Sequence, residues 1–485
     1  MLGLSLRIRP PSSTKFISAA GVEGLRIAAR LRHTLAQSPG QFTRDLSSTS
    51  STSGAFTSSK SVLEGSAAAR NVSPPTILTP KRQFARGGAP IHRFPFDDHM
   101  KIVQRENAAL APNAMDFEYL RDEIALRVVD RIGCIQRSFS NVIDIGCNAG
   151  GIAHYMLQAN YLNYPYIRKS HIDAVTEIAR QEGKEIEIPT RDPNLPQLFP
   201  GFSGLQSLTQ YDVSPILTSR SHDRAKATLA HITELKNKAD RIRKEMAGTP
   251  EVAEATIAAM VANEGIPGEA TIQEGNISAP ELKQMQGPLA DFAQYFKPNS
   301  VDMITSSMAL HWVNDLPKFF KGVMDTLQPD GVFIGAMLGG NTLQELRSSL
   351  VLADTERFGG VTPHMSPLAS PRDIGDLMSA AGFNMVSVDV DTITINYPDL
   401  FTLIAHLQGM GENGAPVEHL RASKVNADTF LAAAAIYEQL FKDEQDLLVA
   451  TFDVMMMIGW KPHPSHDKLV AKRGSATHKI GQTIE

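Results

Sequence analysis

The residues best suited to bind a ligand stand in one short stretch, residues 141–151, which reads NVIDIGCNAGG. They are an acid, an amide and two glycines: Asp144, Asn148, Gly146 and Gly150. Glycine lets the backbone pass close to a ligand, and the amides that open a following helix favour a negatively charged group. The spacing therefore predicts a nucleotide-type site, although an ordinary tight turn without a ligand also fits it.

A second acid, Asp212, ends the stretch LTQYD at residues 208–212. In dinucleotide-binding and related folds, an acid at this place accepts hydrogen bonds from ribose hydroxyls. A simple turn-forming Asp fits the spacing equally well, so both interpretations stay open.

His311 is the candidate for acid–base chemistry, because it directly follows an apolar stretch that should end at the same ligand. The alternative is a packed structural histidine beside Trp312. An iron-dependent oxygenase would use two histidines and a carboxylate. A His-x-Asp pattern occurs at His171 and Asp173, but these residues lie outside the stretches that contain Asp144, Asp212 and His311. We therefore predict no metal site.

A parallel sheet is predicted to position these residues. The run Asn141 to Ile145 is short, apolar and rich in β-branched residues, which predicts a buried strand with a helix starting near residue 152. Further parallel strands are predicted at 208–212, 271–276, 301–310 and 331–338. Two antiparallel edge strands are predicted at 385–390 and 392–397, where apolar and polar residues alternate.

Helices are predicted between these strands from apolar residues at helical spacing, at 116–131, 316–327, 342–357 and 372–381. Asp116 and Asp315 are the expected N-caps. A short helix at 101–105 would cover the ligand. Insertions are predicted at 158–205 and 221–270, and the second resembles a helical hairpin.

The organisation that follows is an α/β, doubly wound, seven-stranded sheet with helical insertions. We expect a helical lead at 87–140, the sheet domain at 141–400 and a C-terminal helical extension at 401–485. Residues 1–93 hold thirteen Lys and Arg but three acids, and residues 47–61 are almost entirely Ser, Thr, Gly and Ala. This composition predicts a mitochondrial transit peptide over about residues 1–86, with a merely disordered tail as the alternative.

The composition argues against several other classes of protein. A net charge of −5 gives no reason to expect nucleic acid as a partner. Two cysteines, Cys134 and Cys147, are too few for a disulfide framework and lack metal-ligand spacing. No apolar run reaches the roughly eighteen residues that a membrane span needs.

Taken together, the motifs resemble the class I S-adenosylmethionine (SAM) dependent methyltransferases. The shared features are Asp144-x-Gly146 with Gly150, the acid Asp212 and the turn QPDG at 328–331. The chain is still more similar to a divergent branch, the mitochondrial arginine hydroxylases that assist respiratory complex I assembly. That likeness is carried by motifs at 307–317, 329–337, 342–347, 407–412, 458–461 and 473–477.

The resemblance implies a role for each matching residue. Asp144, Gly146 and Gly150 would hold the methionine part and the ribose of SAM, and Asp212 would bind the ribose hydroxyls. Asn276 would contact the adenine, and Ser307 would begin the floor of the pocket. Asn148 stands where relatives have glycine, and asparagine tolerates a positive φ better than most residues do.

The implied function is hydroxylation of an arginine on an iron–sulfur subunit of complex I, with SAM as the bound cofactor. The implied location is the matrix side of the inner mitochondrial membrane, with peripheral membrane association. Two alternatives stay open. One is SAM-dependent methylation of a protein or of a carrier-bound malonyl thioester, which needs little beyond positioning. The other is a non-catalytic assembly chaperone that uses residues 400–477 as its partner surface.

Overall fold

The computed structural model describes residues 6–8, 95–135, 137–163, 204–263, 271–272, 279–417 and 427–468. All of these belong to one compact unit. The remainder of the expected leader lies outside the described residues.

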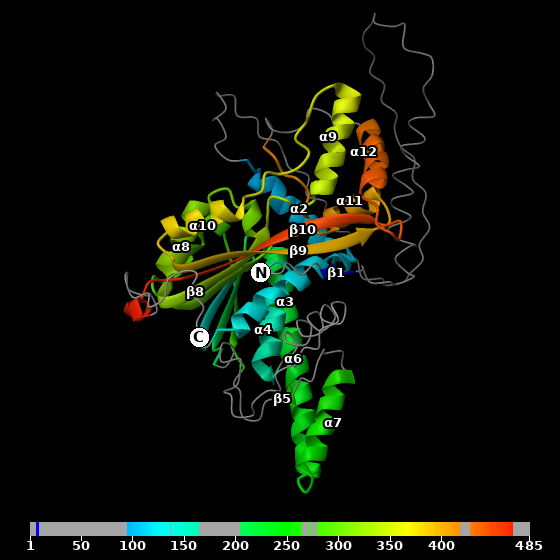
Figure 1. Ribbon diagram of the computed structural model, residues 1–485. Coiled ribbons are helices and arrows are strands. Elements are labelled where there is room, and N and C mark those ends of the chain that lie inside the picture. Colours follow the sequence, from blue (N-terminus) through cyan, green and yellow to red (C-terminus); the bar gives the residue numbers. More distant parts are fainter. Residues whose placement is uncertain are drawn as a thin grey trace, which may run out of the picture. The chain divides into compact units, whose positions relative to one another are not determined.

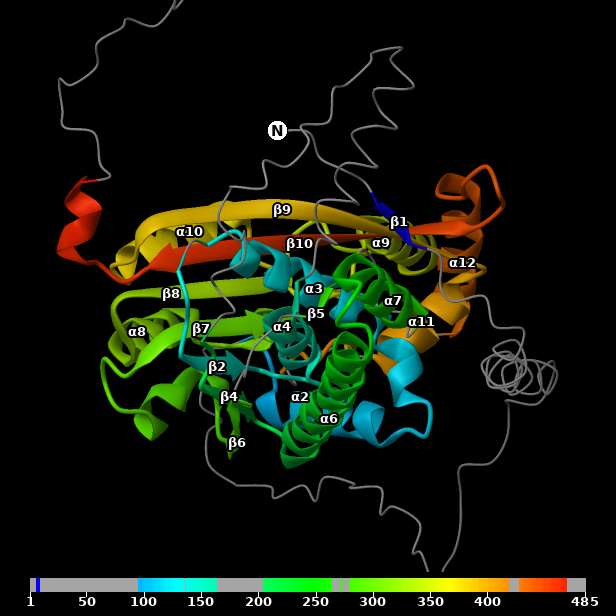
Figure 2. The same cartoon turned by 90° about the horizontal axis from the view of Figure 1, so that it is seen from below.

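Seven strands form the predicted sheet in the order β9-β10-β8-β7-β2-β4-β6, which Figure 2 shows from top to bottom. Their bounds are β2 (Asn141–Ile145), β4 (Ser207–Asp212), β6 (Glu281–Gln286), β7 (Val301–Ser307), β8 (Leu327–Leu338), β9 (Asn384–Tyr397) and β10 (Leu448–Trp460). The pairs from β8 to β6 are parallel, whereas β10 is antiparallel to both β8 and β9. An eighth strand, β1 (Leu6–Ile8), pairs parallel to β9. The doubly wound α/β prediction is confirmed.

Helices cover both faces of the sheet because its strands are apolar on both sides. On one face Val142 and Met456 pack with α3 (Tyr119–Gly133), α4 (Gly151–Tyr161) and α6 (Pro215–Glu245). On the other, Ile143 and Met457 pack with η3 (Leu289–Tyr295), α8 (Leu316–Thr326) and α10 (Pro371–Ala380). Neighbouring residues of one strand therefore serve opposite cores.

The other helices lie around the carboxyl ends of the parallel strands and in the C-terminal part. They are α2 (Asp98–Leu110), η1 (Ala114–Phe117), η4 (Leu310–Trp312), α9 (Gln344–Phe358), α11 (Leu400–Gly409), α12 (Ala427–Leu440) and η6 (Pro464–Lys468). Helix α2 confirms the short helix expected near residues 101–105. The pair α9 and α12 lies side by side in Figure 1.

The insertion after β4 is a helical hairpin, as predicted. Helix α6 returns as α7 (Pro250–Asn263), which Figure 1 shows beside it. Leu235 and Ala239 of α6 pack against Ile257 and Val261 of α7 in a small separate core. The first insertion is described only at its ends, because residues 164–203 lie outside the described part of the chain.

The predicted third strand is wrong. Residues Thr271–Ile272 form β5, which pairs with β3 (Leu162–Asn163) in a separate antiparallel ribbon. The position beside β4 is taken by β6 instead. Strand β6 is a mostly exposed edge strand of sequence ELKQMQ, so it lacks the apolar run by which a buried strand is recognised.

Residues 401–485 were expected to form a helical extension, and this prediction is wrong because the region also contains a strand of the sheet. Helices α11 and α12 are present, but β10 lies within the same region and completes the sheet between β8 and β9. The two predicted edge strands at 385–390 and 392–397 are one continuous strand, β9. Residue 400 is therefore no boundary of the sheet.

Of the two predicted helix N-caps, Asp315 is confirmed and Asp116 is wrong. Asp315 caps α8 by accepting a hydrogen bond from the Lys318 amide at 3.0 Å. Asp116 caps nothing, because it is exposed within η1 and the long helix α3 begins only at Tyr119.

Candidate functional site

The glycine turn after β2 confirms the predicted backbone geometry. Gly146 and Gly150 have φ values of +69° and +82°, and a Cβ on Gly146 would lie 2.2 Å from Cβ of Ala309. A Cβ on Gly150 would lie within 3.0 Å of Ser221. Neither position therefore accepts a side chain.

Asn148 occupies the left-handed region with a φ of 49°, as its residue type allows. Its Nδ2 donates to the carbonyl oxygens of Gly146 at 3.0 Å and of Ser307 at 2.7 Å. The side chain thus ties the turn to the end of β7. A glycine at this position would leave that connection unmade.

Asp144 is the most strongly perturbed acid of the turn. It is 1% exposed, and its Oδ1 accepts from the Thr305 hydroxyl at 3.2 Å. Its Oδ2 has no hydrogen-bond partner among the described residues. Burial raises the pKa of Asp144 to about 7, with Thr305 opposing and Asp212 adding to the rise. A cationic group beside Oδ2 would restore its charge.

Asp212 lies at the end of β4 and faces the same turn. Its Oδ2 accepts from the backbone N–H of Asn148 at 3.2 Å, and its Oδ1 accepts from the backbone N–H of Ser214 at 3.2 Å. The side chain is fully buried. The structure thus brings Asp144, Asn148, Asp212 and Ser307 together, and we call this group with its two glycines the cradle.

Helix α2 covers the Asp212 and Asn148 side of the cradle. The Arg105 guanidinium donates to Oδ1 of Asn148 and lies 3.5 Å from Oδ2 of Asp212. Glu106, the next residue, accepts from the Ser214 hydroxyl at 2.9 Å. The cavity left at the turn measures about 10 Å³, which is too small for more than about one water. A ligand group that binds Asp212 therefore needs Arg105 to leave it.

Arg121 of α3 forms one wall of this cavity. It donates to Glu118 at 3.2 Å and to Glu412 at 2.7 Å, and it also donates to the Met410 carbonyl oxygen. Its Nε has no partner among the described residues, although the side chain is buried. An unpaired buried donor at this place suits an anionic ligand group such as a carboxylate.

Glu412 connects Arg121 with the predicted His311. Its Oε2 lies 3.0 Å from Nε2 of His311 and accepts from the Trp312 indole at 2.7 Å. Burial alone would raise the pKa of Glu412, but His311, Arg121 and Lys101 together hold it well below its ordinary value. Glu412 is therefore ionised at neutral pH, and it holds three side chains in place.

His311 itself is almost completely buried and lines neither the cavity at the turn nor the larger cavity described below. Burial lowers its pKa in spite of Glu412. Its ring stacks at a tilt on Trp312, with centroids 5.3 Å apart. The geometry is that of the packed histidine beside Trp312, and acid–base chemistry by His311 stays a prediction; His311 contacts Glu412, which lines the larger cavity.

Lys101 completes the cluster from α2. Its Nζ lies 3.2 Å from the centre of the Trp312 ring and donates to the carbonyl oxygens of Gly411 and Asn413, both at 2.8 Å. Burial lowers the pKa of Lys101 well below its ordinary value. Helix α2 is thus anchored at Lys101 as well as at Arg105.

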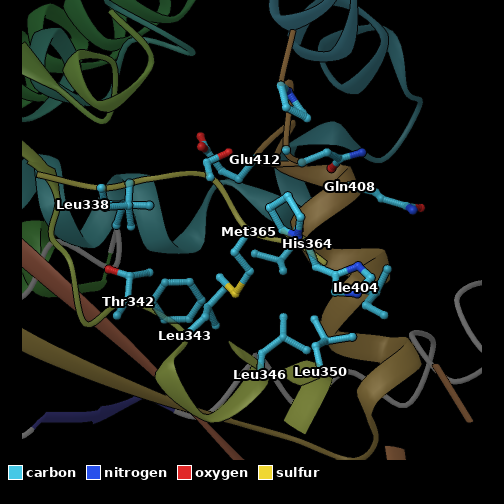
Figure 3. A pocket seen from close by; sticks show the side chains of 18 of the residues that line it. Leu338, Thr342, Leu343, Leu346, Leu350, His364, Met365, Ile404, Gln408 and Glu412 are labelled. Carbon is cyan, nitrogen blue, oxygen red and sulfur yellow. The ribbon is translucent and has the colours of Figure 1, made fainter. Parts of the chain in front are cut away.

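A cavity of about 480 Å³ opens on the far side of Glu412, and we call it the inner chamber. Figure 3 shows Glu412 at the top of the view and Leu346 and Leu350 at the bottom, with Met365 between them. Its lining is mostly apolar and comes from β8, α9, α11, α12 and β10. Volume and composition are those of a small-ligand or side-chain site.

Some predicted residues cannot be placed. Asn276, the expected adenine contact, lies outside the described residues, and so do His171 and Asp173. Within the described ranges, no group of three or more His, Cys, Asp or Glu is arranged to hold a metal. No helix in the described part is long and apolar enough to cross a membrane.

Several residues that build the site were not predicted from the sequence, namely Arg105, Glu106, Arg121, Glu118 and Lys101. Glu412 lay within a motif that carried the family resemblance, but no role was attached to it. A buried arginine on a helix otherwise filled with surface charge gives no periodic signal. Only the fold shows that Arg121 and Glu412, which are 291 residues apart, meet.

Comparison with known proteins agrees with this geometry. Residues 117–388, more than half of the chain, match a family model described as a methyltransferase domain. The human protein named mitochondrial arginine-hydroxylase NDUFAF5 is 33% identical over 80% of this chain and 82% of its own.

Two further relatives match shorter parts. The protein of the same name from Dictyostelium discoideum is 44% identical over 40% of this chain and 44% of its own. A malonyl-[acyl-carrier protein] O-methyltransferase from Xylella fastidiosa is 33% identical over 34% of this chain and 52% of its own. The strand order, the methyltransferase-domain match and the human relative together show that the chain belongs to the arginine-hydroxylase family of class I SAM-methyltransferase-fold proteins.

Proposed function

We propose that this protein is a SAM-binding arginine hydroxylase that assists complex I assembly by modifying an arginine of an iron–sulfur subunit. The observation that carries the proposal is the 33% identity to the human arginine-hydroxylase over 80% of the chain. The cradle supports it, because the acids and glycines that the family resemblance assigns to SAM lie around one turn.

The polar groups of the cradle fit SAM by their chemistry. Oδ2 of Asp144 offers an unpaired acceptor for the amino group of the methionine part, and Nε of Arg121 offers an unpaired donor for its carboxylate. Asp212 would take the ribose hydroxyls once Arg105 withdraws. When bound, SAM supplies a methyl group on a good leaving group, which serves the methyl-transfer alternative directly. Hydroxylation would instead take one oxygen atom from dioxygen, with a two-electron reductant that converts the other oxygen atom to water.

Entry of SAM requires a displacement of α2. Arg105 binds the same two cradle side chains that the ribose would approach, Asp212 and Asn148. Cofactor binding would exchange these contacts for ribose contacts, and α2 would then act as a lid. His311 is a positioning residue in this scheme, because it acts by holding Glu412 at 3.0 Å.

Location and partner follow from the resemblance. The human, mouse and rat relatives are named mitochondrial, and the basic, acid-poor leader of this chain supports the same location. The protein would meet a complex I iron–sulfur subunit at the matrix side of the inner membrane, to which it would attach peripherally.

The test is peptide mass spectrometry of the complex I iron–sulfur subunits from cells with and without this protein. Loss of one oxygen from a single arginine in the deficient cells is expected. Loss of a methyl group instead would replace hydroxylation by methyl transfer. An unmodified arginine in both, with complex I still failing to assemble, would favour the chaperone alternative.

Methylation of a carrier-bound malonyl thioester is the second candidate, because the Xylella relative with that name matches 34% of the chain. A bacterial strain that lacks this methyltransferase and requires biotin distinguishes the two. Growth without biotin after introduction of this chain would favour the thioester reaction, and continued dependence is expected for a protein hydroxylase.

A further inference from the structure

A second cavity adjoins the inner chamber and extends it. This outer chamber measures about 420 Å³. Both chambers are lined by Leu350 of α9 and by the segment 363–366, with Gly414 opposite. Exposed Val361 lies at the outer chamber, and Glu412 lies at the inner one. The pair thus forms a route from the surface toward the wall of the cradle.

The walls of this route are largely apolar, but two buried polar atoms on it are unpaired. Oδ1 of Asn413 and Oγ of Ser366 have no hydrogen-bond partner among the described residues. Ser366 lines both chambers, and its Oγ would lie 3.7 Å from a Cβ on Gly414. A buried acceptor left unpaired costs about 1–3 kcal/mol, so the expected occupant donates hydrogen bonds.

The inner end also offers a hydrogen-bond acceptor to a further cation, besides Arg121 and Lys101. Arg121 is shared between two carboxylates, those of Glu118 and Glu412. Two ionised oxygens can accept about four hydrogen bonds, and Glu412 accepts three from the described residues. A guanidinium group, with five N–H donors on a slender apolar stem, matches both the remaining acceptors and the apolar walls.

We infer that the two chambers bind an extended segment of the substrate protein. Its arginine would lie in the inner chamber and point toward Glu412 and Asn413, and a neighbouring apolar side chain would fill the outer chamber. This inference rests on the proposed function, and it assigns the acceptor site that the cradle lacks. A purely hydrocarbon ligand fits less well, because it would leave Asn413 and Ser366 unpaired.

The first test is photo-crosslinking in cells from the full chain with p-benzoylphenylalanine in place of Met365, which lines both chambers. The matched control carries the same group in place of Leu352, an exposed residue of α9. We expect an adduct from position 365, and not from 352, on a peptide with an arginine within a few residues. An adduct on a lipid or isoprenoid would overturn the inference. So would the absence of any adduct in cells whose complex I still assembles.

The second test fills the chambers. Leu350→Trp should reduce arginine hydroxylation at least tenfold, whereas SAM binding and the melting temperature should change little because the added ring enters existing space. Leu352→Trp on the exposed side of the same helix should leave hydroxylation as it is. Undiminished hydroxylation in a folded Leu350→Trp variant would overturn the inference.

The two tests separate this inference from the proposed function. An adduct on a peptide whose arginine is unmodified would keep the acceptor site and refute hydroxylation. If the arginine is hydroxylated equally well by the Leu350→Trp variant, the proposed hydroxylation would stand and the acceptor site would be refuted.

Discussion

Two sites lie on either side of the Arg121–Glu412 ion pair, and they differ in size, polarity and origin. The cradle leaves a cavity of only about 10 Å³, and Arg105 lies 3.5 Å from its Asp212. The inner chamber leaves about 480 Å³ between apolar side chains. The cradle is covered by a charged helix, α2, whose Arg105 contacts Asp212 and Asn148. The chamber is left open among the side chains of the described residues.

The two sites also differ in the interactions that fix the positions of their side chains. The cradle depends on hydrogen bonds to backbone groups at fixed spacing, so its polar atoms are preorganised. The chamber depends on the packing of helices and strands that come from distant parts of the chain. Loss of a single polar atom should therefore impair the cradle, whereas the chamber should respond mainly to changes of volume.

The largest effect is expected when Asp144 and Asp212 are both replaced by Asn. Hydrogen bonds to charged groups are worth about 1.5–3 kcal/mol each, so the affinity for SAM should fall at least about 100-fold. Isothermal titration calorimetry on the folded double variant measures it. Asp376→Asn, at an exposed acid, is the control. Unchanged affinity would break the comparison, because the cradle would then not be the cofactor site.

Glu412→Gln tests the shared wall. It removes one of the two carboxylates that pair with the buried Arg121 guanidinium at nearly constant shape. Loss of a buried ion pair costs about 3–5 kcal/mol, so the free energy of unfolding should fall by up to that amount. Urea unfolding at neutral pH should show the loss. Glu356→Gln is the matched control, because its ion pair with Arg357 is exposed and worth at most about 1 kcal/mol. Equal effects of the two variants would mean that Glu412 does not join the two sites.

Asp144→Asn alone should stabilise the protein, in contrast to its effect on binding. The pKa of Asp144 is about 7 in the folded chain, against an ordinary value of 3.8. Between these values the folded chain binds more protons than the unfolded chain, so the free energy of unfolding falls as pH rises. Above pH 7 the penalty is complete and reaches roughly 4 kcal/mol.

The measurement is the melting temperature without ligand from about pH 5 to about pH 8. The variant should exceed the parent at pH 8, and the difference should shrink as the pH falls. A difference that grows toward low pH would contradict the assigned pKa of Asp144. The combination of higher stability and lost binding is common where binding groups are held under strain.

The smallest effect is expected from Arg105→Met, and it concerns the lid. Without Arg105, SAM no longer competes with a guanidinium for Asp212, so its affinity should rise roughly tenfold. The ligand-free protein should melt at a lower temperature, because Asp212 loses a buried partner. Arg127→Met, at a partly exposed ion pair, is the control. A weaker affinity would show that Arg105 contacts SAM directly.

The sequence predicted the cradle better than the chamber for a physical reason. Asp144, Asn148 and Gly150 lie within one strand, turn and helix, and the positive φ of Asn148 could be expected from its residue type. The third strand could not be read, because edge strand β6 is polar and exposed. The placement of β10 was missed although its sequence LVATFDVMMMIGW contains four β-branched residues, because the region after residue 400 was assigned to helices as a whole.

The chamber could not have been predicted from spacing. Glu412 and Leu350 each belong to motifs or helices that look ordinary alone, and they face one cavity only in the folded chain. Arg105 was expected in a short helix over the ligand, but its contact with Asp212 depends on the tertiary placement of α2.

The late position of β10 in the chain bears on folding after import, because a chain led by a transit peptide would enter the organelle N-terminus first. Strands β2, β4, β7 and β8 would then arrive well before β10, yet β9 can join them only through it. Until then β8 offers an open edge that could pair with another chain. Truncation before residue 448 should therefore yield aggregated protein and not a smaller folded enzyme, and chaperones should hold the arriving chain until β10 follows.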